Sequence, residues 1–124
     1  MSDTNGTILI AEDELPLAKA LAMKLESAGY TVTAVTNGSE CLAELKAKKY
    51  DMLLLDLIMP ETDGFAVLEE LKSRGTKIPT IVLSNLGQEE DIERAKSLGA
   101  KDYFIKADTS LSAIVDMVRD KLKD

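Results

Sequence analysis

Hydrophobic positions along the chain alternate between two periods. Short runs rich in branched apolar residues lie at positions 7–11, 31–35, 51–56, 78–83 and 102–106. Each run is followed by a segment with helical spacing, as in Leu17, Leu21 and Leu25, with Gly29 as the stop signal. The last segment starts near Ser110 and places these residues on one face: Leu111, Ile114, Val115, Val118 and Leu122. The pattern predicts five strand–helix units.

Strands that alternate with helices predict an α/β fold, in which a parallel sheet is covered by helices on both faces. The run from Met52 to Leu55 is apolar at every position, which is typical of a strand buried on both faces, so we expect it at the centre of the sheet. Open sheets of this kind bind ligands beyond the carboxyl ends of the strands. The polar residues expected there are Glu12, Asp13, Asp56, Ser84 and Lys106.

Composition narrows the class of protein. The chain has 124 residues, of which 45% are apolar and 30% charged, so we expect a single globular domain over residues 1–124. A net charge of -7 argues against direct nucleic-acid binding. No apolar run approaches the roughly 20 residues of a membrane helix, and the polar first residues do not resemble a signal peptide. With Cys41 as the single cysteine, we expect a cytoplasmic domain without membrane contact.

The expected strand ends combine acidic, basic and hydroxyl groups. The sequence contains no histidine, so imidazole is excluded as a base, nucleophile or metal ligand. Converging carboxylates from Glu12, Asp13 and Asp56 would repel one another unless they bind a cation, and oxygen ligands suit Mg²⁺, with Mn²⁺ as a possible substitute. Asp56 could then accept a phosphoryl group, while Lys106 and Ser84 bind its oxygens.

The residues resemble the receiver domain of two-component response regulators, from about Thr7 to Leu122. The resemblance rests on four segments, residues 8–14, 55–64, 82–85 and 99–106. It implies a flavodoxin-like (βα)5 three-layer sandwich with strand order 2-1-3-4-5, similar to chemotaxis regulators. It also implies the following roles: Asp56 as phosphoacceptor, Glu12, Asp13, Asp56 and the backbone carbonyl of Ile58 around Mg²⁺, Ser84 and Lys106 on the phosphoryl group, and Tyr103 with Ser84 as switch residues.

The resemblance also implies partners. A histidine kinase or phosphotransfer protein would supply the phosphoryl group, and a downstream effector protein or domain would read the result. The switching surface is expected on the fourth helix, fifth strand and fifth helix, where it could also support a phosphorylation-dependent homodimer. Its expected residues are Glu89, Glu90, Asp91, Arg94, Lys96, Asp102, Tyr103 and Arg119. We expect a stand-alone regulator that signals rather than an enzyme with turnover.

Several positions depart from the family pattern or tune it. Ala107 follows Lys106 where the family usually has proline, so a trans peptide is expected there. Asn85 replaces a small residue, and its amide could crowd the phosphoryl site or form a hydrogen bond near it. Ile58 and Leu86 are apolar where polar side chains could orient an attacking water, which predicts slow self-dephosphorylation.

Other classes of protein remain open at this point. A phosphorylation-independent interaction module would keep the fold without the switch, and Asn85 and Ala107 favour considering it. A flavodoxin-like cofactor binder is disfavoured because the acidic residues 12–14 would repel a phosphate. An aspartyl phosphatase would normally need a second Asp at the position of Ile58.

Overall fold

The computed structural model describes residues 5–122. Within this range the chain forms five strands, five α-helices and one short 3₁₀ helix. The strands are β1 (Thr7–Ala11), β2 (Thr31–Val35), β3 (Met52–Leu55), β4 (Thr80–Ser84) and β5 (Asp102–Ile105). The helices are α1 (Leu15–Ser27), α2 (Gly38–Ala47), α3 (Gly64–Arg74), α4 (Glu89–Ser97), η1 (Lys106–Asp108) and α5 (Leu111–Leu122).

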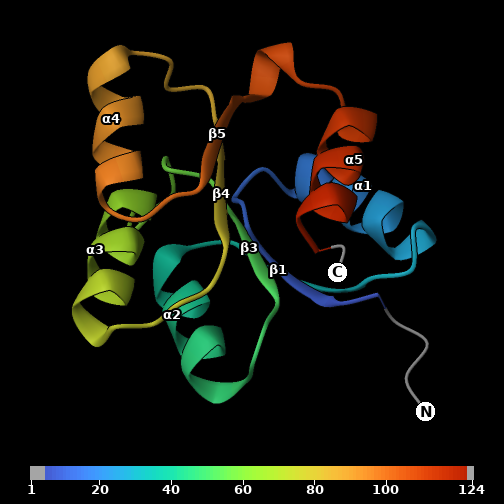
Figure 1. The fold of residues 1–124 in the computed structure, drawn as a ribbon, viewed down its shortest axis with the longest axis horizontal. Coiled ribbons are helices and arrows are strands. Elements are labelled where there is room, and N and C mark those ends of the chain that lie inside the picture. The colour runs from blue at the N-terminus through green and yellow to red at the C-terminus, as the bar shows by residue number, and fades with distance from the viewer. Residues whose placement is uncertain (1–4, 123–124) are drawn as a thin grey trace.

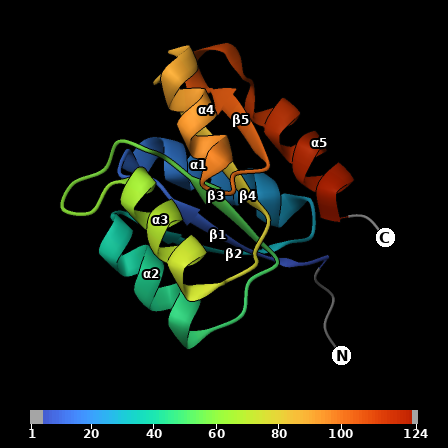
Figure 2. The same cartoon turned by 60° about the vertical axis from the view of Figure 1, so that its left-hand side comes forward.

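All pairings in the sheet are parallel, and the strand order is β2-β1-β3-β4-β5. The predicted α/β class and strand order are therefore confirmed, with the fully apolar strand β3 at the centre. Helices α1 and α5 lie together on one face of the sheet, while α2, α3 and α4 cover the other (Figures 1 and 2). The molecule is a three-layer sandwich.

Two apolar cores fill the spaces between the layers, and the alternation of side chains along the strands separates them. Leu9 and Leu53 belong to the core beneath α2, α3 and α4. Ile8 and Leu54 belong to the core beneath α1 and α5. The predicted buried face of the last helix is confirmed, because Ile114, Val115 and Val118 pack in this second core. Cys41 is buried in the first core, as its packing role requires, and burial raises the pKa of its thiol to about 12.

Strand ends differ from the predicted ranges by one or two residues, and the differences at the carboxyl ends fall at the candidate site. Strand β3 stops at Leu55, which leaves Asp56 just beyond it. Strand β4 starts at Thr80 and ends with Ser84 rather than covering 78–83. Strand β5 ends at Ile105, because the backbone turns into η1 at Lys106. Asp56, Ser84 and Lys106 therefore each lie where a strand gives way to the next segment.

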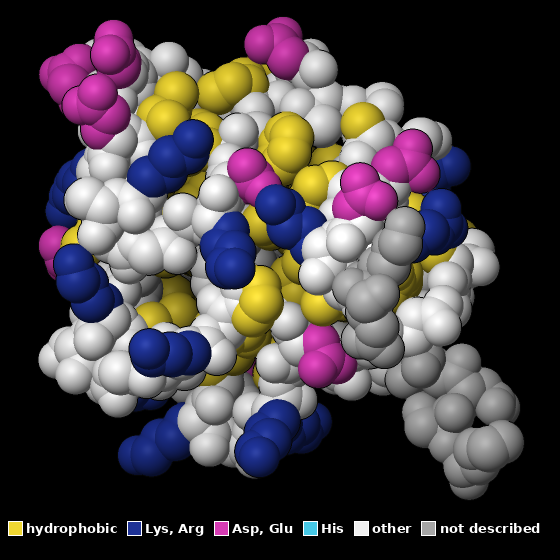
Figure 3. All heavy atoms as spheres, in the orientation of Figure 1, with side chains coloured by type: hydrophobic (Ala, Val, Ile, Leu, Met, Phe, Trp, Pro, Cys, Tyr) yellow, Lys and Arg dark blue, Asp and Glu magenta, His cyan; other side chains and the backbone are white. Residues whose placement is uncertain are grey.

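Charged side chains at several helix ends match the helix dipoles. Acidic residues occupy the first turn of α4, whereas basic residues occupy the last turns of α2 and α3, as the helix dipoles favour. Figure 3 shows acidic side chains gathered at the start of α4 and basic ones towards the opposite edge. Across the described residues, no helix has the length and apolar character needed to cross a bilayer.

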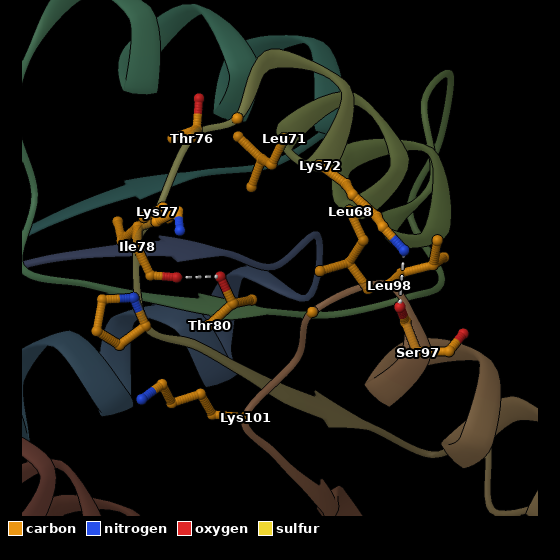
Figure 4. A pocket seen from close by; sticks show the side chains of 13 residues that line it. Leu68, Leu71, Lys72, Thr76, Lys77, Ile78, Thr80, Ser97, Leu98 and Lys101 are labelled. Atoms are coloured by element: carbon orange, nitrogen blue, oxygen red, sulfur yellow. Dashed lines mark hydrogen bonds between the residues drawn. The ribbon is translucent and has the colours of Figure 1, made fainter.

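A cavity of about 560 Å³ lies at the amino-terminal edge of the sheet, between the ends of α3 and α4. Its lining includes Leu68, Leu71 and Leu98, and Lys72 crosses it to donate a hydrogen bond to the carbonyl of Ser97 at 3.1 Å (Figure 4). The lysine thus satisfies a carbonyl at the end of α4. This cavity is at the opposite edge from Asp56 and is separate from the candidate site.

Candidate functional site

Three carboxylates meet at the carboxyl ends of β1 and β3. Glu12 follows β1 and is 3% exposed, and Asp56 follows β3 and is 4% exposed. Asp13 is exposed on the solvent side of the same cluster. One carboxylate oxygen from each of these residues lies within 4.8 Å of the others. The structure therefore brings together the three carboxylates that the sequence predicted.

Backbone hydrogen bonds between strands hold two of these residues in place. The amide of Asp56 donates to the carbonyl of Ala11 at 2.9 Å, and the amide of Glu12 donates to the carbonyl of Val35 at 3.0 Å. The bonds continue the parallel pairing one residue past the strands, so they fix where each side chain begins. A carboxylate that leaves a rigid sheet edge is better positioned than one on a free loop.

Lys106, which directly follows β5, contacts this acidic cluster through its side chain. Its Nζ lies 2.7 Å from Glu12, 3.0 Å from Asp56 and 3.2 Å from Glu14. The lysine side chain is 9% exposed, so the pairs with Glu12 and Asp56 are largely shielded from water. Charge-assisted hydrogen bonds of this kind are stronger than neutral ones. Lys106 is the cation that balances the two buried carboxylates in this structure.

The pKa values follow from burial and from these contacts. Burial raises the pKa of Glu12, and its hydrogen bond with Lys106 offsets part of the shift. Burial on its own would lower the pKa of Lys106, but the hydrogen bonds with Glu12 and Asp56 outweigh it and raise the pKa above its ordinary value. Lys106 is therefore fully charged at neutral pH.

Replacing Lys106 with Met should destabilise the metal-free protein by about 3 kcal/mol at neutral pH, because two buried carboxylates lose their cation. The loss should be smallest at acid pH, where Glu12 can bind a proton, and should grow as pH rises through the raised pKa of Glu12. Urea unfolding at several pH values measures this effect. The exposed Lys101→Met is the control and should change stability by less than about 0.5 kcal/mol. Equal losses for both variants would contradict the account.

The acidic cluster fits a hard divalent cation. Its donors are carboxylate oxygens, which Mg²⁺ prefers, and Asp13 leaves the cluster open to solvent, where bound waters would complete the coordination. The backbone of Ile58 lies next to the acidic cluster, because its amide donates a hydrogen bond to Asp56 Oδ1 at 3.2 Å. The predicted coordination by the carbonyl of Ile58 stays a prediction.

Ser84 and Tyr103 meet at the peptide groups of Leu86. Ser84 is fully buried, and its hydroxyl accepts a hydrogen bond from the amide of Leu86 at 3.3 Å. The Tyr103 hydroxyl donates to the carbonyl of the same residue, and the ring packs against the first core. Burial raises the pKa of Tyr103, so its hydroxyl keeps its proton. Both predicted switch residues are thus attached to one residue of the loop between β4 and α4.

Sequence reasoning missed three contacts. Glu14 reaches Lys106, although the sequence indicated only a residue near the start of a helix. Leu86 joins Ser84 to Tyr103 through its backbone, which no side-chain pattern reveals. Asn85 bonds the amide of Ala107, whose peptide with Lys106 is trans as expected. The sequence features that could have indicated these contacts were the acidic run 12–14 and the unusual Asn85.

The predicted switching surface would lie on α4, β5 and α5, and two of its charged residues already form contacts within the domain. Arg94 lies 4.2 Å over the ring of Phe65 and pairs with Glu69 of α3 at 3.3 Å. Asp102 pairs with Lys121, which joins β5 to α5. A partner that uses this surface would therefore compete with contacts inside the domain.

Fold and site together define a class: a doubly wound α/β domain with an acidic cluster and a lysine at the carboxyl ends of its strands. Residues 8–119 match the family model of the response regulator receiver domain. The chain therefore belongs to the receiver domains of response regulators, whose members act in two-component signalling. Such domains typically bind Mg²⁺ at an acidic cluster of this kind.

Individual relatives support this assignment. The chain is 36% identical over 107 residues to the transcriptional regulatory protein ResD of Bacillus subtilis (strain 168), covering 86% of this chain and 44% of that protein. It is 36% identical over 99 residues to the response regulator SaeR of Staphylococcus aureus (strain USA300), covering 80% of this chain and 43% of that protein. The chain thus spans less than half the length of these relatives.

Solved structures show the same likeness. The receiver domain of the Francisella response regulator 1452 has a TM-score of 0.90 and 28% identity, covering 95% of this chain and 97% of that one. The signal receiver domain of a signal transduction histidine kinase from Syntrophus aciditrophicus has a TM-score of 0.84 and 34% identity, covering 94% of this chain and 89% of that one. The fold class is therefore confirmed by comparison as well as by topology.

Proposed function

We propose that this chain is a phosphoacceptor receiver domain over residues 1–124 and that Asp56 takes the phosphoryl group from a histidine kinase or phosphotransfer protein. The observation that carries the proposal is the contact of 3.0 Å between Lys106 Nζ and the Asp56 carboxylate, inside a cluster of three acids. Three carboxylates that could hold a metal ion and the amine of Lys106 lie together at one sheet edge, as this function requires.

In the proposed reaction, a carboxylate oxygen of Asp56 attacks phosphorus and forms a P–O bond. The bond between phosphorus and the donor nitrogen breaks, and its electron pair stays on the imidazole of the donor. The product is an acyl phosphate on Asp56. Mg²⁺, held by Glu12, Asp13, Asp56 and the carbonyl of Ile58, would supply positive charge for the phosphoryl oxygens.

Lys106 and Ser84 would then bind the transferred group. Lys106 already reaches Asp56, so it needs only a small movement to contact a phosphoryl oxygen. Ser84 would exchange its contact with the Leu86 amide for another phosphoryl oxygen. Because Leu86 also accepts the hydrogen bond of Tyr103, a shift of Ser84 would disturb Tyr103 and the surface around β5.

The proposed output is a change of partner affinity rather than turnover of a substrate. Phosphorylation would bias the surface of α4, β5 and α5 towards an effector protein or domain, or towards a second copy of this chain. The net charge of -7 still argues against direct nucleic-acid contact by this domain. We place the phosphoryl transfer in the cytoplasm, where kinases draw on ATP.

The experiment that tests the proposal is the intact mass of the purified protein after incubation with acetyl phosphate. We expect one phosphoryl adduct with Mg²⁺ and none when the metal is removed by a chelator. An adduct that forms equally well without metal would contradict the role of the acidic cluster. If neither an adduct nor Mg²⁺ binding is found, the phosphorylation-independent interaction module becomes the better description.

The acyl phosphate should be long-lived. Ile58 is 54% exposed beside Asp56, and its apolar side chain cannot orient an attacking water. Ile58→Asn should speed loss of the phosphoryl group by about tenfold, which is less than a positioned general base achieves, because the Asn amide can only orient the water. The decay of the adduct after removal of the donor measures this rate. Met23→Asn is the control, because it changes another exposed apolar residue, which lies on α1. Equal decay in the two variants would contradict the explanation.

A further inference from the structure

A hydrogen bond joins the two loops that carry the phosphoryl-binding residues. The side-chain oxygen of Asn85 accepts from the backbone amide of Ala107 at 3.1 Å. Asn85 directly follows Ser84, and Ala107 directly follows Lys106. Ser84 and Ile105 are the last paired positions of β4 and β5. The bond therefore lies one residue beyond the end of β4 and two residues beyond the end of β5.

The donor in this bond depends on the residue at position 107. Any amino acid except proline supplies a backbone N–H there. The acceptor depends equally on position 85, since a smaller aliphatic side chain has no oxygen to reach across the loop. Both positions were singled out in the sequence, and the structure shows that they contact each other.

The bond matters most when Lys106 loses its present partners. In this structure Glu12, Glu14 and Asp56 hold the amine of Lys106. A divalent cation bound by Glu12 and Asp56 would compete for the same carboxylate oxygens. Lys106 must nevertheless remain close enough to meet the incoming phosphoryl group.

The backbone that carries Lys106 turns sharply into η1. Within this turn the Thr109 hydroxyl donates to the carbonyl of Ile105 at 2.8 Å, which is a local contact. The bond between Asn85 and Ala107 ties the same turn to the end of β4, 22 residues away in sequence. It thus fixes the turn relative to Ser84 rather than only to itself.

We infer that Asn85 is a positioning residue, which holds the Lys106 turn against the Ser84 loop through the amide of Ala107 and so sets the spacing of the two phosphoryl-binding groups. The inference rests on the proposed function of Asp56. Asn85 does not need to touch the phosphoryl group, because it acts through the position of Lys106.

The test compares phosphorylation rates of the full chain with acetyl phosphate and saturating Mg²⁺. Asn85→Ala and Ala107→Pro remove the acceptor and the donor, and each should lower the rate about fivefold, as the loss of one hydrogen bond allows. The double variant should be no slower than either single one. Mg²⁺ affinity should stay unchanged, since no metal ligand is altered.

Two further measurements separate positioning from a general loss of structure. Hydrogen exchange at the amide of residue 107 should speed up in Asn85→Ala, while Ala107→Ser, which keeps the N–H, should retain the original protection. In a Lys106→Met background, Asn85→Ala should cause no further loss of rate. A merely structural role for Asn85 would still slow the reaction in that background.

The outcomes distinguish this inference from the function on which it rests. If the unchanged chain accepts no phosphoryl group, the proposed function fails and this inference fails with it. If the unchanged chain is phosphorylated and Asn85→Ala reacts at the same rate, the inference alone is overturned. Additive losses in the Asn85 and Ala107 variants would also overturn it.

Discussion

Asp56→Asn is expected to abolish the phosphoryl adduct completely. The amide of Asn is a far weaker nucleophile than a carboxylate, and the substitution also removes one charge from the acidic cluster. The fold should survive, because Asn has nearly the same shape and the backbone bond from residue 56 to Ala11 is unchanged. Intact mass after incubation with acetyl phosphate and Mg²⁺ measures the loss.

Asp63→Asn is the matched control for this variant. Asp63 lies on the loop after β3, but its side chain caps α3 by accepting from the amide of Ala66 at 2.9 Å. Asn caps helices about as well as Asp, so the control should retain both stability and the adduct. An adduct that persists in Asp56→Asn, or vanishes in both variants, would contradict Asp56 as the acceptor.

Gly64→Ala should cost about 3 kcal/mol of stability, which is a large effect for one methyl group. A Cβ at this position would lie 2.4 Å from the carbonyl oxygen of Asp56 and 2.7 Å from the Cα of Leu57. Both are backbone atoms, so relief requires a shift of the peptide that carries the proposed phosphoacceptor. Phosphorylation of this variant should therefore also slow. Urea unfolding and the phosphorylation rate measure the two consequences.

Gly75→Ala separates this steric effect from ordinary glycine preference. Gly75 ends α3 with φ of +68°, and an added Cβ would meet no atom within 4 Å. Alanine at this position should lower the free energy of unfolding by about 1 kcal/mol, because of the left-handed backbone alone. The position is at the amino-terminal edge of the sheet, far from Asp56. If Gly64→Ala cost no more stability than Gly75→Ala, the close approach to Asp56 would not explain it.

Much of the fold was predictable because burial constrains the sequence directly. Strand β3 is buried on both faces, so every position from Met52 to Leu55 is apolar, and this pattern placed it at the centre of the sheet. The predicted strand ends differed from the observed ones by one or two residues. A strand ends where backbone pairing stops, as before Lys106. The η1 turn that follows has no hydrophobic periodicity, so the sequence does not show where β5 ends.

The residues that gather at the site were also predictable, since parallel strands bring their carboxyl ends to one edge. The contacts among them were not. Glu14 reaches Lys106 across 92 positions of sequence, and the hydrogen bond of Asn85 spans 22. Such contacts depend on which rotamer a side chain adopts once the loops are packed. Sequence identified Asn85 and Ala107 as unusual, and the structure was needed to show that they are partners.

The measurement that tests the central claim most directly is the location of the phosphoryl group in the chain. After incubation with acetyl phosphate and Mg²⁺, reduction with borohydride converts an aspartyl phosphate to homoserine, which peptide mass spectrometry can locate. We predict that the modification is found at Asp56, at the carboxyl end of β3, and that it forms only when Mg²⁺ is present. Modification at another carboxylate such as Asp13, or phosphate found only on a hydroxyl group, would contradict the account.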